Sequence, residues 1–419
     1  MLRWLDLQDV GPAPQMRMDL AERINAIAGD NGLGKTFLLD IAWWALTRTW
    51  AGTPALPLGG KLGVIEYQVH GKTGDATPVK SIYRPDRQDW PIKVMRPPIP
   101  GIVIYLRIDG GFSVWDPARN YWRKDSPDRP AAYHFNHRQI WDGLKIGDVS
   151  VCEGLERDWV SWQKGREEQF EILGAVLEKL SPPGERLRPG KPTRVFLGEG
   201  FDRPTLQLVN GDVPVVLSSA GLRRVLALAY LMVWVWHEHR QMAKLLFREP
   251  ETRMTILIDE PENHLHPNWQ RRFIPALLEA AKILRVQHAS DLQLIFSTHS
   301  PMVLASLEPI FDEAEDALFH LHNTEGKVML EKQVWAKQGD VTNWLVSEVF
   351  GLEQARSVEA EKAIEAAEAW MRGEINQLPP GLNNPSLIDS ELKRVLAGHD
   401  PFWPRWIIER EKSAGGKKK

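Results

Sequence analysis

Cysteine is almost absent from this sequence, which contains only Cys152. One cysteine cannot form an intramolecular disulfide, so we expect the protein to fold in a reducing cytosol. Long apolar segments are also missing: the longest run, residues 225–236, has twelve residues, whereas a bilayer span needs about 20. An acidic residue stands among the first six, and no long apolar stretch follows them, which is not the pattern of a signal peptide. These absences predict a cytoplasmic protein with no membrane partner, in which residues 225–236 form a buried core helix.

Charge of one sign is not in excess either. The 52 basic and 55 acidic side chains give a net charge of −3, so the whole surface is not that of a basic nucleic-acid binder. The candidate for a local contact with nucleic acid is the stretch that contains Arg186, Arg188, Lys191 and Arg194, although such a run is more often a solvated face. Residues 37–217 contain no sustained heptads, which excludes a long coiled-coil arm and favours a compact inserted lobe.

The second half of the sequence alternates between helical and strand patterns. This alternation predicts an α/β fold, with a mixed sheet covered by helices. The main domain is expected in two parts, separated by an inserted lobe. Our expected regions are an N-terminal half with a strand-rich lobe (1–149, the lobe containing 62–83 and 100–115), an inserted helical lobe (150–192), a C-terminal half (193–335) and a helical C-terminal segment (336–419).

A glycine-rich loop follows the buried strand expected at residues 24–28. It fits the pattern G-x-x-x-x-G-K-[ST] and precedes a helix; its residues are Gly29, Asp30, Asn31, Gly32, Leu33, Gly34, Lys35 and Thr36. Glycines let successive backbone N–H groups surround phosphates, and the helix N-terminus adds the positive end of a dipole. We expect Lys35 to reach the β- and γ-phosphates of ATP and the Thr36 hydroxyl to bind Mg²⁺. An incidental turn is the alternative, but it rarely matches all four fixed positions in this context.

Two acidic residues and a histidine end later apolar strands. Asp259 and Glu260 follow the strand at 254–258, and His299 follows the strand at 292–296. Asp259 is the expected Mg²⁺ ligand, and Glu260 is the expected general base that activates water. His299 is a candidate contact for the γ-phosphate, although a histidine at a strand end is more often structural. Because the phosphate loop is present in the same sequence, we favour a catalytic role for Asp259, Glu260 and His299 over a structural one.

A fourth motif, Leu217-Ser218-Ser219-Ala220-Gly221-Leu222-Arg223-Arg224, opens the long helix. Its free N–H groups and a serine hydroxyl can form a second anion site, so Ser218, Ser219 and Gly221 are candidate nucleotide contacts. Taken alone, the motif is only a good helix N-cap. Of the two serines, we favour Ser219 as the one that acts in catalysis.

In this order, the four motifs resemble the phosphate loop, acidic pair, switch histidine and signature of ABC-type ATPases. The residues after the acidic pair, Glu262-Asn263-His264-Leu265-His266-Pro267, resemble the D-loop of the branch that contains the RecF, Rad50 and OLD families. The resemblance implies a dimer or higher even-numbered oligomer that sandwiches ATP, each phosphate loop facing the partner's signature. The signature departs from the Ser-Gly-Gly-Gln of transporters, and the family's glutamine between the first and fourth motifs is not identifiable, Gln68 and Gln88 being the candidates.

A narrower resemblance is to the ATPase subunit of Septu-type anti-phage defence systems. Residues 219–239 and the C-terminal stretch His399-Asp400-Pro401-Phe402-Trp403-Pro404-Arg405-Trp406 carry it. It implies a separate HNH-type nuclease partner controlled by ATP. The alternatives left open are a DNA-repair ATPase of the RecF or Rad50 kind that acts directly on DNA, the energy subunit of a membrane transporter, and a scaffold with silent ATP sites.

Two other patterns have competing interpretations. The string His134-Phe135-Asn136-His137 mimics an HNH nuclease motif, but we interpret it as a loop, and we expect no nuclease activity in this chain. Phe402, Trp403 and Trp406 are either exposed anchors for the effector subunit or aromatic side chains that fold back onto the chain's own helices.

Overall fold

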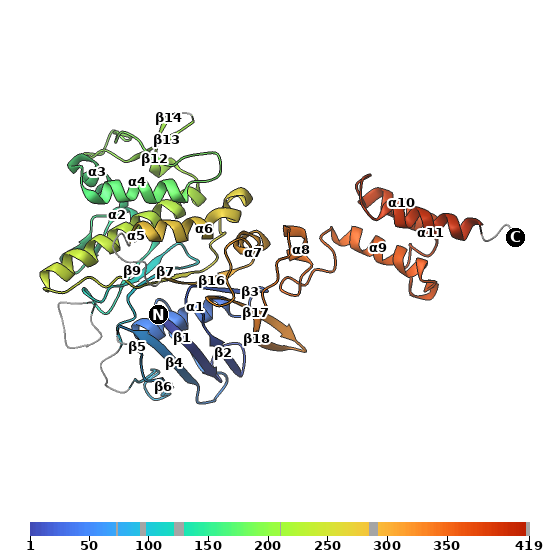
Figure 1. Cartoon of the computed structure of the whole chain (residues 1–419), viewed down its shortest axis with the longest axis horizontal. Coiled ribbons are helices and arrows are strands. Elements are labelled where there is room, and N and C mark those ends of the chain that lie inside the picture. The colour runs from blue at the N-terminus through green and yellow to red at the C-terminus, as the bar shows by residue number, and fades with distance from the viewer. Residues whose placement is uncertain (73, 93–97, 121–129, 210, 285–291, 416–419) are drawn as a thin grey trace. The chain divides into compact units, whose positions relative to one another are not determined.

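The computed structural model describes residues 1–72, 74–92, 98–120, 130–209, 211–284 and 292–415. The chain divides into two compact units, Met1–Gly339 and Asp340–Lys419. Eight strands form the main sheet of the first unit (Figure 1). In spatial order the strands are β18 (Lys327–Gln333), β17 (Asp316–Thr324), β3 (Ile24–Gly29), β16 (Leu292–Thr298), β15 (Met254–Ile258), β7 (Ile102–Leu106), β8 (Phe112–Trp115) and β9 (Tyr133–Phe135).

The middle of this sheet is parallel and its margins are antiparallel. β17, β3, β16, β15 and β7 run in one direction, while β18, β8 and β9 are antiparallel additions. All positions of β15 and β16 are buried. A strand covered on both faces is apolar throughout rather than alternating, and this explains runs such as Thr255-Ile256-Leu257-Ile258. The predicted mixed α/β sheet is confirmed.

One assignment to the strand-rich lobe was wrong. Residues 100–115 were expected in that lobe, but they form β7 and β8 of the main sheet, where β7 pairs with β15. All five residues of β7 are buried, as a strand between two helical layers requires. The unbroken apolar run was therefore the sign of a central strand.

The strand-rich lobe itself is a separate five-stranded antiparallel sheet. Its strands are β1 (Leu2–Gln8), β2 (Gln15–Asp19), β4 (Val64–Gly71), β5 (Gly74–Asp75) and β6 (Val79–Ile82). β4 alternates buried and half-buried residues, as a strand with one face on the core does. Helix α1 (Lys35–Thr47) contacts strands of both sheets, and one apolar cluster joins it to both.

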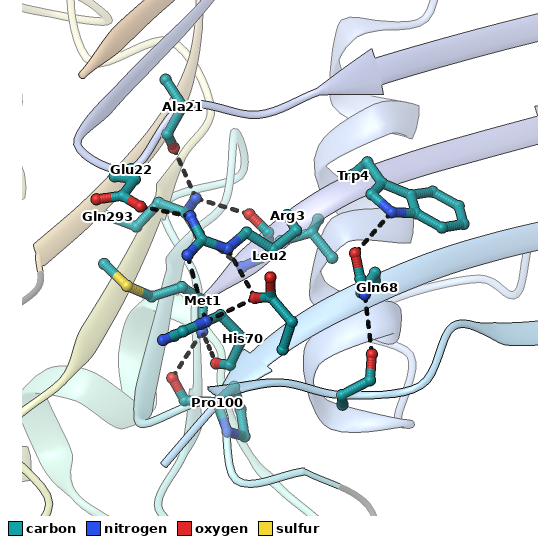
Figure 2. A network of polar contacts seen from close by, with 12 residues as sticks. Met1, Leu2, Arg3, Trp4, Ala21, Glu22, Gln68, His70, Pro100 and Gln293 are labelled. Atoms are coloured by element: carbon teal, nitrogen blue, oxygen red, sulfur yellow. Dashed lines mark hydrogen bonds and ion pairs between the residues drawn. The ribbon is translucent and has the colours of Figure 1, made fainter. Parts of the chain in front are cut away.

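Polar contacts fasten the first strand of the lobe to the main sheet (Figure 2). The side chain of Gln293, on β16, accepts a hydrogen bond from the Leu2 N–H (2.8 Å) and donates to the carbonyls of Leu2 (2.8 Å) and Ala21 (2.9 Å). Within the lobe, Trp4 Nε1 donates to the side chain of Gln68 (2.9 Å). Gln293 is buried, so these bonds replace those it would otherwise make with water.

Helices lie over the main sheet in Figure 1, and the inserted segment packs among them. α4 packs on both α5 and α6. The inserted lobe does not end at residue 192 as expected, because β12 pairs with β13, which pairs with β14. Apart from β15 and β16, the elements between β9 and β17 in the sequence are α2 (His137–Asp142), β10 (Leu144–Ile146), β11 (Val149–Cys152), α3 (Leu155–Gly165), α4 (Glu168–Leu180), β12 (Arg188–Pro189), β13 (Thr205–Leu208), β14 (Gly211–Pro214), the 3₁₀ turn η1 (Val215–Leu217), α5 (Ala220–Leu245), α6 (Pro267–Ile283) and α7 (Pro301–Leu307).

The apolar run at residues 225–236 is buried in the middle of α5, as predicted. Among the described residues, no helix is both long and apolar enough to cross a bilayer.

The second unit is helical, with a small core of its own. It contains α8 (Val341–Leu345), α9 (Val358–Met371), the 3₁₀ turn η2 (Ile375–Gln377), α10 (Pro385–Val395) and α11 (Trp403–Gly415). Phe402 and Trp406 are buried against α9 and α10. Trp406 Nε1 donates to Asp389 (3.0 Å), and its ring meets Trp370 edge-on at 5.5 Å. The aromatic residues fold back onto the chain's own helices, so the interpretation of Phe402 and Trp406 as exposed anchors was wrong.

Replacing Trp406 by alanine should therefore destabilise the second unit. Removing a fully buried tryptophan costs ~3–5 kcal/mol, a large share of the stability of a unit of this size. Hydrogen exchange followed by mass spectrometry should show faster exchange in α9–α11 and unchanged exchange in the main sheet. Ile408→Ala, on the half-exposed face of the same helix, is the matched control and should change little. Equal exchange in both variants would contradict the packing described here.

Candidate nucleotide-binding site

The phosphate loop joins the end of β3 to the start of α1. Gly29 has φ of 142°, and a Cβ there would lie 2.0 Å from the Leu321 carbonyl oxygen, so only glycine fits beside β17. Gly34 immediately precedes α1 with φ of 105°, again a conformation that favours glycine. Asp30, Asn31, Gly32 and Thr36 are exposed. The loop therefore presents its backbone and the Thr36 hydroxyl to solvent at the N-terminus of a 13-residue helix, which is an anion-binding arrangement.

Lys35 is buried beneath this loop. Its Nζ donates to the carbonyls of Gly29 (2.9 Å) and Asp30 (2.8 Å) and lies 3.5 Å from Nδ1 of His299. Burial lowers the pKa of the Lys35 ammonium, and the carboxylates of Glu260 and Asp259 oppose that shift. The ammonium group is thus held among carbonyls and acids at the point where phosphates would enter.

Asp259 lies at the end of β15, almost completely buried. Its Oδ1 accepts a hydrogen bond from Ser297 Oγ (2.5 Å), while its Oδ2 is buried and has no hydrogen-bond partner among the described residues. A buried carboxylate oxygen without a partner is costly, and a cation would satisfy it. Carboxylate and hydroxyl oxygens suit Mg²⁺, so Asp259 and the exposed Thr36 fit the magnesium site expected from the sequence.

Glu260 and His299 face each other next to Lys35. Glu260 Oε1 lies 3.4 Å from His299 Nε2. Burial raises the pKa of Glu260, and the neighbouring Asp259 adds to this. Burial, followed by the charge of Lys35, lowers the pKa of His299. The raised pKa makes the Glu260 carboxylate a stronger proton acceptor when it is ionised, and the lowered pKa favours the neutral imidazole of His299.

Glu262 forms a hydrogen bond with the backbone of His299. Its Oε1 accepts hydrogen bonds from the His299 N–H (2.7 Å) and from Thr298 Oγ1 (2.9 Å). Burial raises its pKa. This residue therefore links the loop after the acidic pair to the end of β16 and orients His299.

The serines lie elsewhere, on a separate cleft of about 340 Å³. Ser219, Gly221, His264 and His266 line it together with residues of the inserted lobe, and none of residues 29–36 does. Ser219 caps α5 by accepting a bond from the Leu222 N–H (3.3 Å) and is exposed, which leaves its O–H free to donate.

Ser218 and Gly221 have covered positions in the same turn. Ser218 Oγ is buried without a partner among the described residues, so of the two serines only Ser219 offers its hydroxyl to the cleft. Gly221 is buried, and a Cβ there would lie 2.3 Å from the His264 carbonyl oxygen. Its place is explained by the close packing of α5 on the loop after the acidic pair.

Lys35, Asp259, Glu260 and His299 thus meet at the carboxyl edge of β3, β15 and β16, with the signature turn on another face. The fold is that of a P-loop ATPase of the ABC type. Residues 241–305 match a family described as "AAA domain, putative AbiEii toxin, Type IV TA system". The probable ATPase of retron Ec83 from Escherichia coli is 30% identical over 99 residues, which are 24% of this chain and 15% of that protein.

The solved structures to which this chain is similar include heads of SMC proteins. The SMC head bound to the C-terminal winged-helix domain of ScpA covers 80% of this chain and 98% of its own, with 15% identity and a TM-score of 0.46. The SMC head domain from Thermotoga maritima covers 80% and 99%, with 16% identity and a TM-score of 0.40. The fold assignment rests on the strand order and motif positions of this chain rather than on these scores.

Two glutamine candidates from the sequence lie away from this edge. Gln68 bonds with Trp4 and with the Ala76 carbonyl inside the strand-rich lobe (Figure 2), and Gln88 is exposed in a turn of the same lobe. Neither candidate therefore contacts the phosphate loop or the acidic pair. The strand beside β15 is β7, and the Leu106 carbonyl at its end accepts a bond from the Asp259 N–H (2.9 Å). Arg107 comes directly after Leu106, so the residue at the end of β7 is an arginine and not the glutamine that the ABC-type resemblance implies.

Sequence reasoning also missed Arg224. Its Nη2 donates to the carbonyls of Asp259 (2.8 Å) and Glu260 (3.3 Å). The signal was present, since this arginine begins the apolar part of α5 and its side chain cannot remain buried without acceptors. Its partners could not be predicted, because every residue has a backbone carbonyl and the sequence does not indicate which ones accept these hydrogen bonds.

The structure also places the string His134-Phe135-Asn136-His137 and His266 of the segment after the acidic pair. His134 is in β9, and Asn136 caps α2 through a hydrogen bond from the Gln139 N–H (2.9 Å), so the string is spread over a strand and a helix start and is not the loop expected. His266 caps α6.

The basic stretch of the inserted lobe is partly neutralised. Arg186 pairs with Glu178 (3.7 Å) and Arg194 with Asp202 (3.1 Å).

Proposed function

We propose that this protein binds ATP with Mg²⁺ and hydrolyses it in a head-to-tail dimer, and that ATP occupancy controls a separate nuclease effector. The observation that carries the ATPase part is the convergence of Lys35, Glu260 and His299 around the unpartnered Asp259 oxygen. A phosphate-binding backbone, a cation site and a carboxylate base at one edge are the parts that phosphoryl transfer to water needs.

Each residue has a distinct task in this proposal. Lys35 leaves the two loop carbonyls and binds the β- and γ-phosphates. Asp259 and Thr36 hold Mg²⁺, which neutralises charge on the phosphates when bound. Glu260 accepts the proton of the attacking water, and His299 contacts the γ-phosphate from the side of Lys35. The neutral imidazole can donate one hydrogen bond there without an added charge.

The dimer follows from the position of Ser219. Its free hydroxyl and the N-terminus of the 26-residue α5 form an anion site, but the cleft that contains them includes no residue of the chain's own phosphate loop. A second copy can bring its nucleotide to this cleft, and two-fold symmetry then completes both sites.

The matches to the retron ATPase and to the AbiEii-type family support a role in bacterial defence. The resemblance to Septu-type ATPase subunits adds a separate HNH-type nuclease as the effector, with the C-terminal unit as our candidate docking region. The test of this part is to look for an HNH-type nuclease gene beside the gene of this chain and to co-express the two: the effector should co-purify, and its activity should change with ATP. The alternative, direct action on DNA, gains no support from the partly neutralised basic stretch.

The dimer is tested by mixing two inactive variants. Lys35→Ala removes a phosphate loop and Ser219→Arg blocks a signature, so each variant alone should be inactive. A heterodimer retains one intact site, built from one variant's loop and the other's signature. With random pairing, an equal mixture should recover about a quarter of wild-type ATPase activity, measured as phosphate release.

Formation of heterodimers is checked by native mass spectrometry. A mixture that contains heterodimers but stays inactive would reject the head-to-tail arrangement if the wild-type Hill coefficient is near one, because the two sites then work independently.

A further inference from the structure

Arg224 clamps the backbone of the catalytic acids from the signature helix. It lies on α5 five residues after Ser219, and its Nη2 donates to the carbonyls of Asp259 (2.8 Å) and Glu260 (3.3 Å). In the described part of the chain it forms no ion pair, although the carboxylates of Asp259, Glu260 and Glu262 are near enough to influence its pKa. Its hydrogen bonds therefore go to the backbone on which those side chains are mounted.

The guanidinium is kept in a costly environment. Burial lowers the pKa of Arg224, against the opposing effect of the acids, and its Nε is buried without a partner among the described residues. A solvated surface arginine would show neither feature. A partly buried charge persists where its hydrogen bonds order the structure around it, and here that structure is the segment that carries Asp259 and Glu260.

That segment has an unusual backbone. Glu260 has φ of 50°, a left-handed conformation that non-glycine residues seldom adopt and that persists only where surrounding contacts enforce it. The Glu260 N–H donates to Ser297 Oγ (3.0 Å), which also donates to Asp259. On the carbonyl side, Arg224 adds to the Asn263 N–H, which donates to the Glu260 carbonyl (3.0 Å). Without Arg224, the carbonyls of Asp259 and Glu260 each lose a hydrogen bond, so the segment that carries the carboxylate is held less firmly.

A second contact joins the same two elements. Gly221 packs so closely on the loop after the acidic pair that any larger residue would clash, since its Cβ would lie 2.3 Å from the His264 carbonyl oxygen. The first two turns of α5 and residues 259–264 therefore move together. Ser219 begins this helix, so the signature turn and the catalytic carboxylate of one chain belong to one rigid group.

We propose that Arg224 is a positioning residue that holds Glu260 in its catalytic orientation and ties that orientation to the signature turn of the same chain. This rests on the proposed ATPase function. In a head-to-tail dimer, Ser219 serves the partner's nucleotide and Glu260 serves the chain's own. Arg224 then links the occupancy of one site to the geometry of the base in the other.

Arg224→Gln tests the inference by separating binding from turnover. The phosphate loop is untouched, so the Kd for ATP should stay within about twofold of wild type, while kcat should fall on the order of 10²-fold, the usual cost of misplacing a catalytic group by about 1 Å. Arg224→Lys keeps a cation that can reach one carbonyl, so its kcat should lie between that of wild type and that of Arg224→Gln. Arg240→Gln removes a guanidinium from the exposed end of the same helix, where it pairs with Glu168, and should behave as wild type.

The outcomes are distinguishable. Absence of ATP turnover in the unchanged protein would reject the proposed function itself. Wild-type kcat in folded Arg224→Gln, or a parallel loss of ATP binding and kcat, would reject only the positioning role. If Arg224→Gln does not fold, Arg224→Lys decides, because kcat below wild type at unchanged Kd supports the role and wild-type kcat overturns it.

Discussion

Replacing Glu260 by glutamine is expected to slow ATP hydrolysis by roughly 10²–10⁴-fold while ATP binding is retained, the usual range for a lost general base. Glutamine has nearly the same shape but cannot accept the proton of the attacking water. Its amide can still face His299, which lies 3.4 Å from the carboxylate in the wild type. Single-turnover phosphate release measures the chemical step, and size-exclusion chromatography should show ATP-bound dimers accumulating.

Glu313→Gln is a matched control for this substitution, because it makes the same change at an exposed position of the same unit. Its turnover should equal that of wild type. Wild-type turnover in Glu260→Gln would show that another group activates the water, and would leave the position of Glu260 beside Lys35 without a catalytic explanation.

Replacing Lys35 by alanine should abolish ATP binding. The ammonium is the point charge for the β- and γ-phosphates, and its loss also removes the two hydrogen bonds that shape the loop at Gly29 and Asp30. Isothermal titration with ATP and Mg²⁺ should show no saturable heat in the variant. Lys61→Ala, which removes an exposed lysine paired with Asp9, should bind as wild type. Unchanged affinity in Lys35→Ala would reject the phosphate-loop assignment.

The main architecture was predictable because local signals were strong. The apolar runs expected as strands at 24–28, 254–258 and 292–296 are β3, β15 and β16. The failures have physical reasons. The apolar run of β7 is compatible with either sheet, and only its pairing with β15, about 150 residues later, decides between them.

The site was predictable where chemistry requires fixed residue types in fixed spacing. Lys35, Asp259 and His299 come together because each ends or follows a strand of one parallel sheet, and the carboxyl ends of such strands share an edge. Contacts made through backbone carbonyls were not predictable. Arg224 and Gln293 bond mainly to backbone groups, for which no complementary residue type appears in the sequence. Trp406 was ambiguous because its partners, Trp370 and Asp389, lie on other helices.

The position of β3 in the main sheet also sets the order in which this protein can fold as it leaves the ribosome. Both neighbours of β3 come late: β16 begins 292 − 29 = 263 residues after β3 ends, and β17 begins 316 − 29 = 287 residues after it. At about 5–20 residues per second, the strand that carries the phosphate loop waits roughly 13–53 s for its first partner. β1, β2 and β4 need only one another, so the lobe can assemble at once. Until β16 emerges, β3 has no strand to pair with on either edge, so the phosphate loop cannot take its final place in the sheet before most of the chain has been made.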